Sequence, residues 1–376
     1  MRYKKILVTG GAGFIGSFLV DELIKKNYRV RIFDNLEKQV HHGKKPSYLN
    51  KKAEFIKGDV RDCKSFEKAL KNTDVVFHLA SRVGVAQSNY EIKDYVDANI
   101  GAIANLMDIV VNKHLPVKKI IMTASMTSYG EGNYFCKRHK IVKPPLRPDS
   151  QMQKHDWEPH CPICKKHVTP IATAENAVIN NNSIYSFTKN AQETMLMLMG
   201  KMYHIPVVSL RCFNVYGPRQ SLSNPYTGVS AIFISRLKNN RPPVIYEDGL
   251  QSRDFVSVHD VVTALISSME SDKANYEIFN IGNGKPTSIK EVAKTLAKLL
   301  GKRQEPVVNF QFRTNDIRHC FADISKAKKV LKWKARVSLE EGLAQLIKWS
   351  EKEEANDLFQ DATKELKAKK LIHEKN

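Results

Sequence analysis

The chain has 376 residues, of which 60 are lysine or arginine and 39 are aspartate or glutamate, and its formal net charge is +21. With 42% hydrophobic and 26% charged residues, the composition is that of an ordinary soluble protein with a substantial core and room for two joined lobes. No apolar run is long enough to span a membrane and no signal-peptide core precedes the first apolar segment, so we expect a cytoplasmic protein.

The positive charge raises the question of a nucleic-acid partner. The lysines are spread over the whole chain, and no basic block is interleaved with aromatic residues, as a single-strand binder would need. We therefore expect the charge to lie on solvated faces and do not expect a nucleic-acid partner. A basic, non-catalytic RNA-binding protein stays an alternative from another functional class.

The first half of the chain alternates short apolar strands with helical segments. Strands are expected at 4–9, 29–33, 53–57, 74–79, 118–124 and 205–211, and helices at 14–26, 64–70, 92–113 and 184–203. This alternation predicts an α/β fold with a Rossmann-type, doubly wound parallel sheet.

The pattern changes near residue 212. Helices are expected near 228–239, 259–270, 288–300 and 338–350, in a smaller mixed α/β lobe. We divide the chain into a Rossmann domain (1–211), a substrate lobe partly interleaved with it (212–350), and a charged C-terminal helix or tail docked on the surface (351–376).

The segment from Ile6 to Gly16 joins an apolar run to a helical pattern through Gly10, Gly13 and Gly16. In a strand–turn–helix unit the first glycine permits the turn, the second lets a pyrophosphate approach the backbone, and the third lets the helix pack closely. The next apolar run ends in Asp34, where a carboxylate accepts hydrogen bonds from ribose hydroxyls and repels a 2′-phosphate. These features predict a site for NAD rather than NADP.

A second motif carries acid–base chemistry. Tyr185 and Lys189 are four residues apart and share one face of the expected helix. An ammonium beside a phenol lowers the pKa of the phenol, so that Tyr185 could take a proton from a substrate hydroxyl. Ser125 ends the strand 118–124, where ligands bind in such folds, and could bridge the tyrosine and the substrate.

With these motifs the chain resembles, from residue 2 to about 350, the extended short-chain dehydrogenase/reductase family in its nucleotide-sugar epimerase/dehydratase branch. The further matching segments are Gly58-Asp59-Val60, His78-Leu79-Ala80-Ser81-Arg82, Asn99, the run from Arg211 to Arg219, Arg253-Asp254-Phe255-Val256, and Arg313-x-x-Asp316. The resemblance implies an NAD site formed by Gly10, Gly13, Phe14, Ile15, Gly16, Asp34, Asn35, Asp59, Val60, Leu79, Ala80, Arg82, Asn99, Tyr185 and Lys189.

The resemblance also implies a nucleotide-diphosphate sugar as substrate, bound by Asn214, Arg219, Arg253, Arg313 and Asp316. The two arginines Arg253 and Arg313 would hold the diphosphate, since guanidinium groups match phosphate oxygens, and Asp316 would hold the ribose. The family usually forms a homodimer through the helices 92–113 and 184–203, where Met195, Met199, Met202 and Tyr203 form either a contact surface or a core stripe.

The residues after Ser125 bear on the type of reaction. Dehydratases of this family carry Asp-Glu there and decarboxylases carry a Glu, whereas this chain has Met126 and Thr127. A hydroxyl residue at 127 is similar to 4-epimerases, in which it contacts the sugar, so Ser125, Thr127, Tyr185 and Lys189 form the expected catalytic set. The expected reaction inverts C4 of a UDP- or dTDP-hexose through a 4-keto intermediate. An NAD(P)-dependent 4-keto-sugar reductase is the alternative.

Sixty positions separate Ser125 from Tyr185, which is far more than the family's usual connection. Within the insertion 131–175, Cys136 and His139 precede Cys161 and Cys164, a spacing that fits a structural zinc ribbon. His155, His160 or His167 could replace His139 as the fourth ligand, and a reduced thiol loop or a redox pair stay open. We expect the insertion to border the substrate pocket, as a lid or a subunit contact, and Cys63, Cys212 and Cys320 to be buried thiols.

Overall fold

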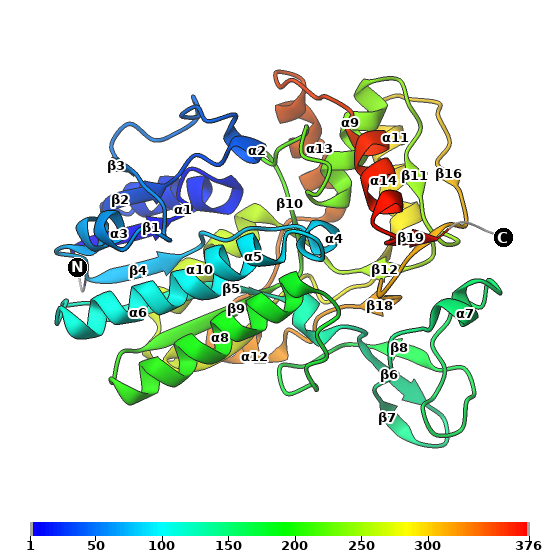
Figure 1. Cartoon of the computed structure of the whole chain (residues 1–376), viewed down its shortest axis with the longest axis horizontal. Helices are drawn as coiled ribbons and strands as arrows, with labels where there is room; N and C mark the ends of the chain where they lie inside the picture. Colours follow the sequence, from blue (N-terminus) through cyan, green and yellow to red (C-terminus); the bar gives the residue numbers. More distant parts are fainter. Residues whose placement is uncertain (1–2, 374–376) are drawn as a thin grey trace.

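The computed structural model describes residues 3–373, which form a large sheet with helices on both faces and a smaller lobe beside it (Figure 1). Seven parallel strands form this sheet in the order β14-β9-β5-β4-β1-β2-β3. The strands are β1 (Lys5–Thr9), β2 (Arg29–Asp34), β3 (Glu54–Lys57), β4 (Val75–His78), β5 (Lys119–Ser125), β9 (Val207–Cys212) and β14 (Glu277–Ile281). The strand order reverses between β1 and β4, as in doubly wound folds, and the predicted fold class is confirmed.

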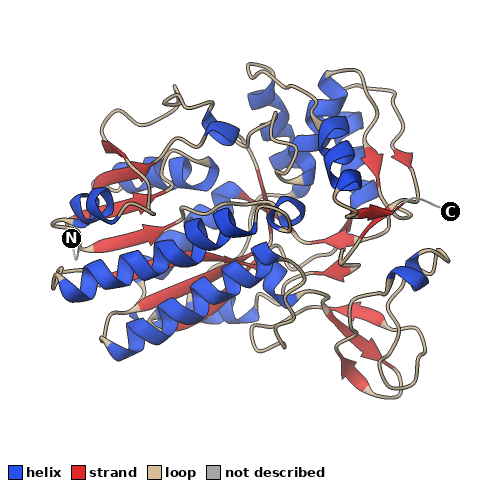
Figure 2. Ribbon diagram, in the orientation of Figure 1, coloured by secondary structure: helices blue, strands red, loops and turns tan. Residues whose placement is uncertain are grey.

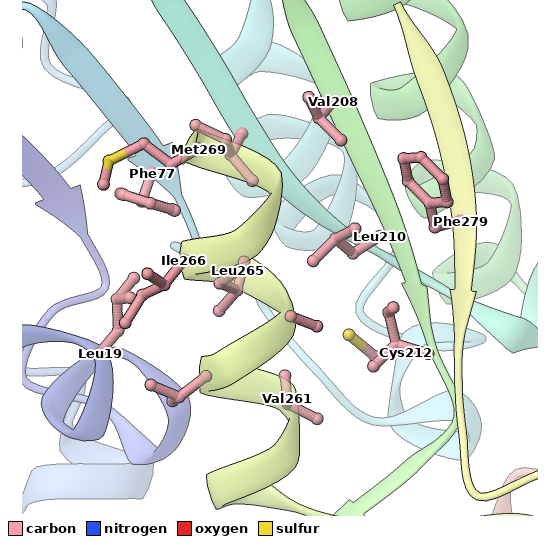
Figure 3. Close-up of a cluster of buried hydrophobic side chains, with 14 of the residues drawn as sticks. Leu19, Phe77, Val208, Leu210, Cys212, Val261, Leu265, Ile266, Met269 and Phe279 are labelled. Carbon is pink, nitrogen blue, oxygen red and sulfur yellow. The ribbon is translucent and has the colours of Figure 1, made fainter. Parts of the chain in front are cut away.

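Two sets of helices cover the faces of the sheet (Figure 2). One set contains α1 (Phe14–Lys25), α10 (Val258–Glu270) and α12 (Ser325–Val330), and the other contains α3 (Cys63–Leu70), α6 (Ala102–Asn112) and α8 (Ile184–Met202). Because both faces are covered, the central strands are apolar on both sides. Figure 3 shows the core on one face, where Leu265 and Met269 of α10 lie against Phe77 and Leu210 of the sheet.

The structure refines two expectations about this domain. The helix expected at 92–113 consists of α5 (Ile92–Tyr95), a π-helical turn η1 (Val96–Gly101) and α6. Turns of this kind are frequent at functional sites. The chain beyond residue 212 returns to the sheet through α10 and β14, so the two lobes share it. The expectation that Cys63 is buried is wrong: the residue opens α3 and is exposed.

The smaller lobe packs three helices around its own apolar core: α9 (Val229–Lys238), α11 (Ile289–Leu299) and α13 (Leu339–Ser350). Its strands are short: β10 (Asn214–Tyr216), β11 (Val244–Ile245), β12 (Ser252–Arg253), β13 (Phe255–Ser257), β15 (Thr287–Ser288), β16 (Val307–Val308), β17 (Phe312–Arg313) and β18 (His319–Cys320). They pair as β10-β13, β11-β16 and β15-β12-β18. This lobe stands at the carboxyl edge of the main sheet (Figure 1).

Two further segments attach to the lobe. The C-terminal segment forms α14 (Phe359–Ala368) and β19 (Ile372–His373), and β19 pairs with β17. The insertion forms a three-stranded antiparallel sheet of β6 (Asn133–Cys136), β7 (Lys140–Val142) and β8 (Thr169–Ile171), with α7 (Asp149–Met152) beside it. It projects at the lower right of Figure 1.

The remaining short helices are α2 (Lys38–His41), α4 (Val85–Ser88), η2 (Met126–Tyr129) and η3 (Asp272–Ala274). Within residues 3–373, every helix is too short or too polar to cross a bilayer. On the outer side of α8, Leu198, Met202 and Tyr203 are exposed, whereas Met195 and Met199 pack against the core. Pairing of two chains over this helix stays a prediction.

Candidate active site

A cavity of about 660 Å³ runs along the carboxyl ends of the main strands and continues between the sheet and the smaller lobe. One end lies over the glycine turn that follows β1, and the other end is bordered by β12, β17 and α14. Ligands of doubly wound folds bind at this edge, beside the point where the strand order reverses. The cavity also has the size of known small-molecule sites.

The glycine turn leaves no space for side chains. Gly10 has a φ of 67°, and a Cβ atom there would lie 2.8 Å from the backbone nitrogen of Ala80. A Cβ atom on Gly16 would lie 2.2 Å from the carbonyl oxygen of Gly10. The backbone of the turn therefore faces the cavity directly, at the N-terminus of α1, which is the arrangement that binds a pyrophosphate. Gly10, Gly13, Phe14, Ile15 and Gly16 all line the cavity.

Carboxylates close the far end of this half of the cavity. Asp34 ends β2 and accepts a 2.9 Å hydrogen bond from the backbone of Ala12. Asp59 accepts hydrogen bonds from Asn35, at 3.0 Å, and from Arg61, at 2.7 and 2.9 Å. Burial acts to raise the pKa of Asp59, but the hydrogen bonds from Arg61 and Asn35 lower it to about 2. The predicted cofactor residues Asp34, Asn35, Asp59, Val60, Leu79, Ala80 and Arg82 line the cavity.

Asn99 is the one predicted cofactor residue of the π-helical turn, and it lies behind the cavity wall. Its side-chain oxygen accepts hydrogen bonds from Ser81, at 2.9 Å, and from the backbone of Arg82, at 2.8 Å, and its nitrogen donates to Thr188 at 2.9 Å. Asn99 therefore ties the loop after β4 to α8 and supports the residues that line the cavity.

The start of α8 is fixed by a capping box. The Ser183 hydroxyl accepts a hydrogen bond from the backbone of Ser186 at 3.1 Å, and the Ser186 hydroxyl accepts one from the backbone of Ser183 at 3.0 Å. This arrangement satisfies two amide groups of the first turn. Tyr185 therefore enters the cavity from the first turn, while Lys189 is buried one turn later and does not line the cavity.

Ser125 and Thr127 lie opposite Tyr185. Thr127 donates hydrogen bonds to the Ser125 hydroxyl from its own hydroxyl, at 2.9 Å, and from its backbone, at 3.2 Å. Thr127 and Tyr185 line the cavity. Ser125 lies just behind them, and its side chain is hydrogen-bonded to that of Tyr185. Ser125 is therefore placed to orient the phenol rather than to line the pocket.

The protonation of the Tyr185–Lys189 pair differs from the expectation. Burial raises the pKa of Tyr185 to about 12, and its hydrogen bond with Ser125 opposes this shift. Burial also lowers the pKa of Lys189 to about 8, although Cys212 and Glu193 favour its charged form. The expected lowering of the Tyr185 pKa by Lys189 is therefore not found, because loss of hydration dominates for both groups.

Three predicted substrate residues meet at the other end of the cavity. Arg313 contacts Asp316 at 3.0 and 2.6 Å, and Arg253 contacts the other oxygen of Asp316 at 3.3 Å. Burial raises the pKa of Asp316, but the two guanidinium groups more than offset this effect and bring it below its usual value. Asn214 also lines the cavity.

Arg219 was expected to join this group, and the structure places it elsewhere. Its guanidinium group binds Asp21 at 2.8 Å and lies over the rings of Phe18 and Tyr48, 4.2 and 4.9 Å from their centroids. It does not line the cavity. Arg219 therefore ties the loop after β10 to α1, which argues against the predicted contact with substrate.

Several amide side chains in the cavity have a free acceptor. Among residues 3–373 no partner is present for the buried side-chain oxygens of Asn182, Asn214, Gln220 and Gln251, all of which line the cavity. Buried polar atoms rarely stay without a hydrogen bond. These oxygens suit a ligand with many donors, such as a sugar or a nucleoside.

The sequence analysis missed the contribution of the C-terminal segment. Phe359, Ala362, Thr363, Leu366 and Leu371 line the cavity beside β17. The apolar residues of this segment are visible in the sequence, but their spacing does not reveal which surface they cover. The segment is therefore part of the wall of the site and not only a helix docked on the outside.

The insertion brings four potential metal ligands together. The thiol of Cys136 lies 3.7 Å from that of Cys164 and 3.7 Å from Nδ1 of His139, which is 3.4 Å from the thiol of Cys161. All four ligand atoms lie within 4.8 Å of one another. A tetrahedral zinc ion requires sulfur–sulfur and sulfur–nitrogen separations of about 3.8 and 3.6 Å, so the geometry fits.

The other histidines of the insertion have different partners. His155 stacks between Trp157 and Phe310, with centroid distances of 5.3 and 5.4 Å. His160 hydrogen-bonds to Asp156 at 2.8 Å, and His167 pairs with His160 through the backbone, with ring centroids 4.9 Å apart. His139 is therefore the histidine of the cluster within the described chain.

A doubly wound sheet with a glycine turn and a Tyr-x-x-x-Lys helix at its carboxyl edge defines an NAD-dependent enzyme of the short-chain dehydrogenase/reductase type. The family described as NAD dependent epimerase/dehydratase matches residues 6–152, and the one described as GDP-mannose 4,6 dehydratase matches residues 167–346. The chain is 35% identical over 349 residues to the dTDP-L-rhamnose 4-epimerase of Burkholderia thailandensis, covering 92% of this chain and 94% of that protein. The chain belongs to the NAD-dependent epimerase/dehydratase family.

Two solved structures are similar over nearly the whole chain. UDP-glucose 4-epimerase from Thermotoga maritima, with UDP-glucose, has a TM-score of 0.76 at 32% identity, covering 93% of this chain and 99% of that chain. UDP-glucuronic acid 4-epimerase from Bacillus cereus, with UDP-glucuronic acid and NAD, has a TM-score of 0.75 at 29% identity, covering 92% and 99%. The protein is accordingly an NAD-dependent nucleotide-sugar enzyme of this family.

Proposed function

We propose that the protein is an NAD-dependent 4-epimerase that inverts C4 of a UDP- or dTDP-hexose through a transient 4-keto sugar. The observation that carries this proposal is one continuous cavity that is lined by the glycine turn, by Arg253 and Arg313, and by Tyr185 and Thr127. We place NAD over the glycine turn and the sugar diphosphate at the two arginines. A sugar whose diphosphate is bound by the two arginines would present its ring to Tyr185, beside the NAD site.

The acidic residues of the cavity favour epimerisation over the other reactions of the family. Those that line it are Asp34, Glu37, Asp59 and Asp316. The first three stand at the carboxyl ends of β2 and β3, in the NAD half, and Asp316 is paired with two arginines. Beside Ser125, the cavity is lined by Met126 and Thr127, neither of which supplies the carboxylate that water loss or decarboxylation would require.

In the proposed mechanism Tyr185 takes the proton of the C4 hydroxyl and later returns it. Ser125 orients the phenol by a hydrogen bond, and Thr127 holds the sugar oxygen from the opposite side. When bound, NAD⁺ would supply a reversible hydride acceptor and a positive charge that adds to that of Lys189 in favouring the phenolate of Tyr185. The diphosphate stays bound to Arg253 and Arg313 while the flat 4-keto sugar rotates. The opposite face of C4 then receives the hydride.

The proposal is tested by incubating the purified protein with a panel of UDP- and dTDP-hexoses, without added NAD, and following the C4 configuration by proton NMR. We expect one pair of sugars to interconvert. Tyr185→Phe should reduce the turnover at least about a thousandfold, because it removes the proton acceptor, and should leave the melting temperature and NAD binding unchanged. Turnover of Tyr185→Phe at the wild-type rate would contradict the mechanism. Oxidation of NADH by a 4-keto sugar, without interconversion of any pair, would indicate a reductase.

We propose that zinc binds at Cys136, His139, Cys161 and Cys164. The separations of their ligand atoms match a tetrahedral ion, and all four positions are filled by the protein. A site that is closed in this way has a structural role.

A further inference from the structure

The insertion lies behind the substrate end of the cavity and does not line it. Among the described residues that line the cavity, none lies between residues 131 and 175. The segment 313–317, by contrast, lines it continuously and carries Arg313 and Asp316. The expectation that the insertion borders the pocket is therefore wrong, because no described residue of the insertion lines the cavity directly. The insertion touches the opposite side of the segment 313–319, which we call the substrate arm.

Arg147 of the insertion makes the first of these contacts, and its side chain is 1% exposed. It forms two 2.9 Å hydrogen bonds with the carboxylate of Glu247, in the smaller lobe. The same guanidinium group donates to the carbonyl oxygen of Asp316 at 3.1 Å and to that of Trp157 at 2.9 Å. Arg147 therefore holds the backbone of the residue whose side chain binds Arg253 and Arg313.

A second set of contacts fixes the end of the arm. The Arg318 side chain is 1% exposed and binds Glu158 of the insertion at 2.6 Å and Asp248 at 2.6 Å. Glu131, which is fully buried at the start of the insertion, accepts hydrogen bonds from the backbone amides of Arg318 and His319, both at 2.8 Å. The insertion thus supplies a cation and two carboxylates to one buried network.

The cavity side of the arm completes the arrangement. Arg253 donates to the carbonyl oxygens of Ile317, at 2.7 Å, and Arg318, at 3.0 Å. The arm is therefore held between Arg253 on the cavity side and Arg147 and Glu131 on the insertion side. A buried ionic network contributes little net stability compared with apolar packing, but it admits few alternative arrangements, because each charge needs its partner.

We infer that the insertion is a positioning module for substrate binding, and that Arg147 is its principal positioning residue. The Cys/His cluster folds the insertion, and Arg147, Glu131 and Glu158 then set the place of the arm that presents Arg313 and Asp316 to the nucleotide diphosphate. This inference rests on the proposed function, since it takes a nucleotide-diphosphate sugar as the ligand of the arm. It assigns to the insertion an effect on substrate affinity and none on the proton transfer at Tyr185.

The test compares Arg147→Lys with the wild-type full-length protein. Lysine keeps the charge facing Glu247 but cannot also reach two carbonyl oxygens in the planar geometry of arginine. We expect the Kd for UDP or dTDP, whichever the wild type binds more tightly, to rise about tenfold in calorimetry. We also expect KM for the sugar nucleotide to rise by a similar factor, while kcat and the Kd for NADH stay within twofold.

The matched control is Arg31→Lys. Arg31 is also buried and donates two hydrogen bonds to carbonyl oxygens, those of Ala69 and Lys71, but it lies on β2 and does not line the cavity. We expect Arg31→Lys to lower the melting temperature without changing either Kd. If Arg147→Lys does not fold, Glu158→Gln is the second variant, since Glu158 is partly exposed, and we expect a Kd for the nucleotide about threefold above that of the wild type.

The outcomes separate the two proposals. A wild-type protein that binds neither UDP nor dTDP overturns the proposed function and, with it, this inference. If the wild type binds one of them, and the folded Arg147→Lys and Glu158→Gln variants bind it equally tightly, only this inference is overturned. An equal rise of the nucleotide Kd in Arg31→Lys would also overturn it, because the effect would then follow from lost stability.

Discussion

His78 illustrates how a single buried group couples this fold to pH. It ends β4, is 2% exposed, and its Nδ1 atom lies 3.2 Å from the Thr9 hydroxyl. Burial, reinforced by the charge of Lys189, lowers the pKa of His78 from 6.5 to about 3. The folded protein therefore keeps this imidazole neutral at pH values at which the unfolded chain binds a proton.

This difference predicts an acid sensitivity. The free energy of unfolding should fall by about 1.4 kcal/mol for each pH unit between about pH 6 and pH 4 through His78, since the unfolded state takes up one proton that the folded state does not. His78→Gln should remove this part of the slope. Urea unfolding of both proteins at several pH values measures the difference, and identical slopes would contradict the prediction.

At the scale of residues, the sequence predicted positions best where the functional residues are only a few positions apart in the chain. Tyr185 and Lys189 share one side of α8 because one helical turn separates them, and Gly10 and Gly16 lie close together because the tight turn requires it. The direction of the Tyr185 pKa and the place of Arg219 could not be read in this way. Both depend on parts of the chain that are distant in sequence. Burial raises the pKa of Tyr185, and the rings of Phe18 and Tyr48 hold the Arg219 guanidinium group.

Among the elements, α14 has a role that its charged sequence conceals. Phe359 lines the cavity, its ring centroid is 6.4 Å from that of Tyr246, and the guanidinium group of Arg236 lies 4.7 Å away. The hydroxyl of Tyr226 donates to Glu365 at 2.7 Å and accepts from that of Tyr90 at 2.7 Å. The helix is therefore fastened across the lobe and the Rossmann domain beside the nucleotide end.

We predict that Phe359→Ala weakens binding of UDP or dTDP about threefold to tenfold, because an aromatic ring contributes about 0.5–1.5 kcal/mol beyond its buried area. NADH binding should not change, because the glycine turn, over which we place NAD, lies at the other end of the cavity. Leu358→Ala is the matched control, since Leu358 precedes the helix, is 40% exposed and does not line the cavity. Equal nucleotide affinity of the two variants would refute a role for α14 in the site.

At the scale of the whole molecule, the insertion is a separate small sheet joined to the lobe by buried charges. Its own apolar core consists of few residues, namely Tyr134, Val142 and Val168 with the cysteines of the cluster. A core of this size does not hold three short strands without a further constraint. We therefore expect the metal to stabilise the insertion and, through it, the lobe.

Metal analysis of the purified protein should find one zinc per chain. Cys161→Ser should remove it and lower the melting temperature by about 2–3 °C, as expected for a loss of about 2 kcal/mol in a protein of this size. Cys63→Ser is the control, because Cys63 is exposed and outside the cluster. Protein without metal, or a Cys161→Ser variant as stable as the control, would contradict the zinc proposal.

The sequence by itself determined the parallel sheet, the glycine turn, the Tyr–Lys helix and the two pairs of Cys/His residues, Cys136 with His139 and Cys161 with Cys164. Each of these depends on residues that are close in the chain or on the alternation of strands and helices, which short-range sterics and hydrophobic periodicity impose. The tertiary structure alone decided that α14 forms a wall of the site, that Arg219 turns away from it, and that the insertion holds the substrate arm from behind. These features depend on contacts between segments that are far apart in the chain, such as Arg147 and Asp316, 169 residues apart, or Arg219 and Asp21, 198 residues apart. Nothing in local spacing encodes which distant surfaces fit together.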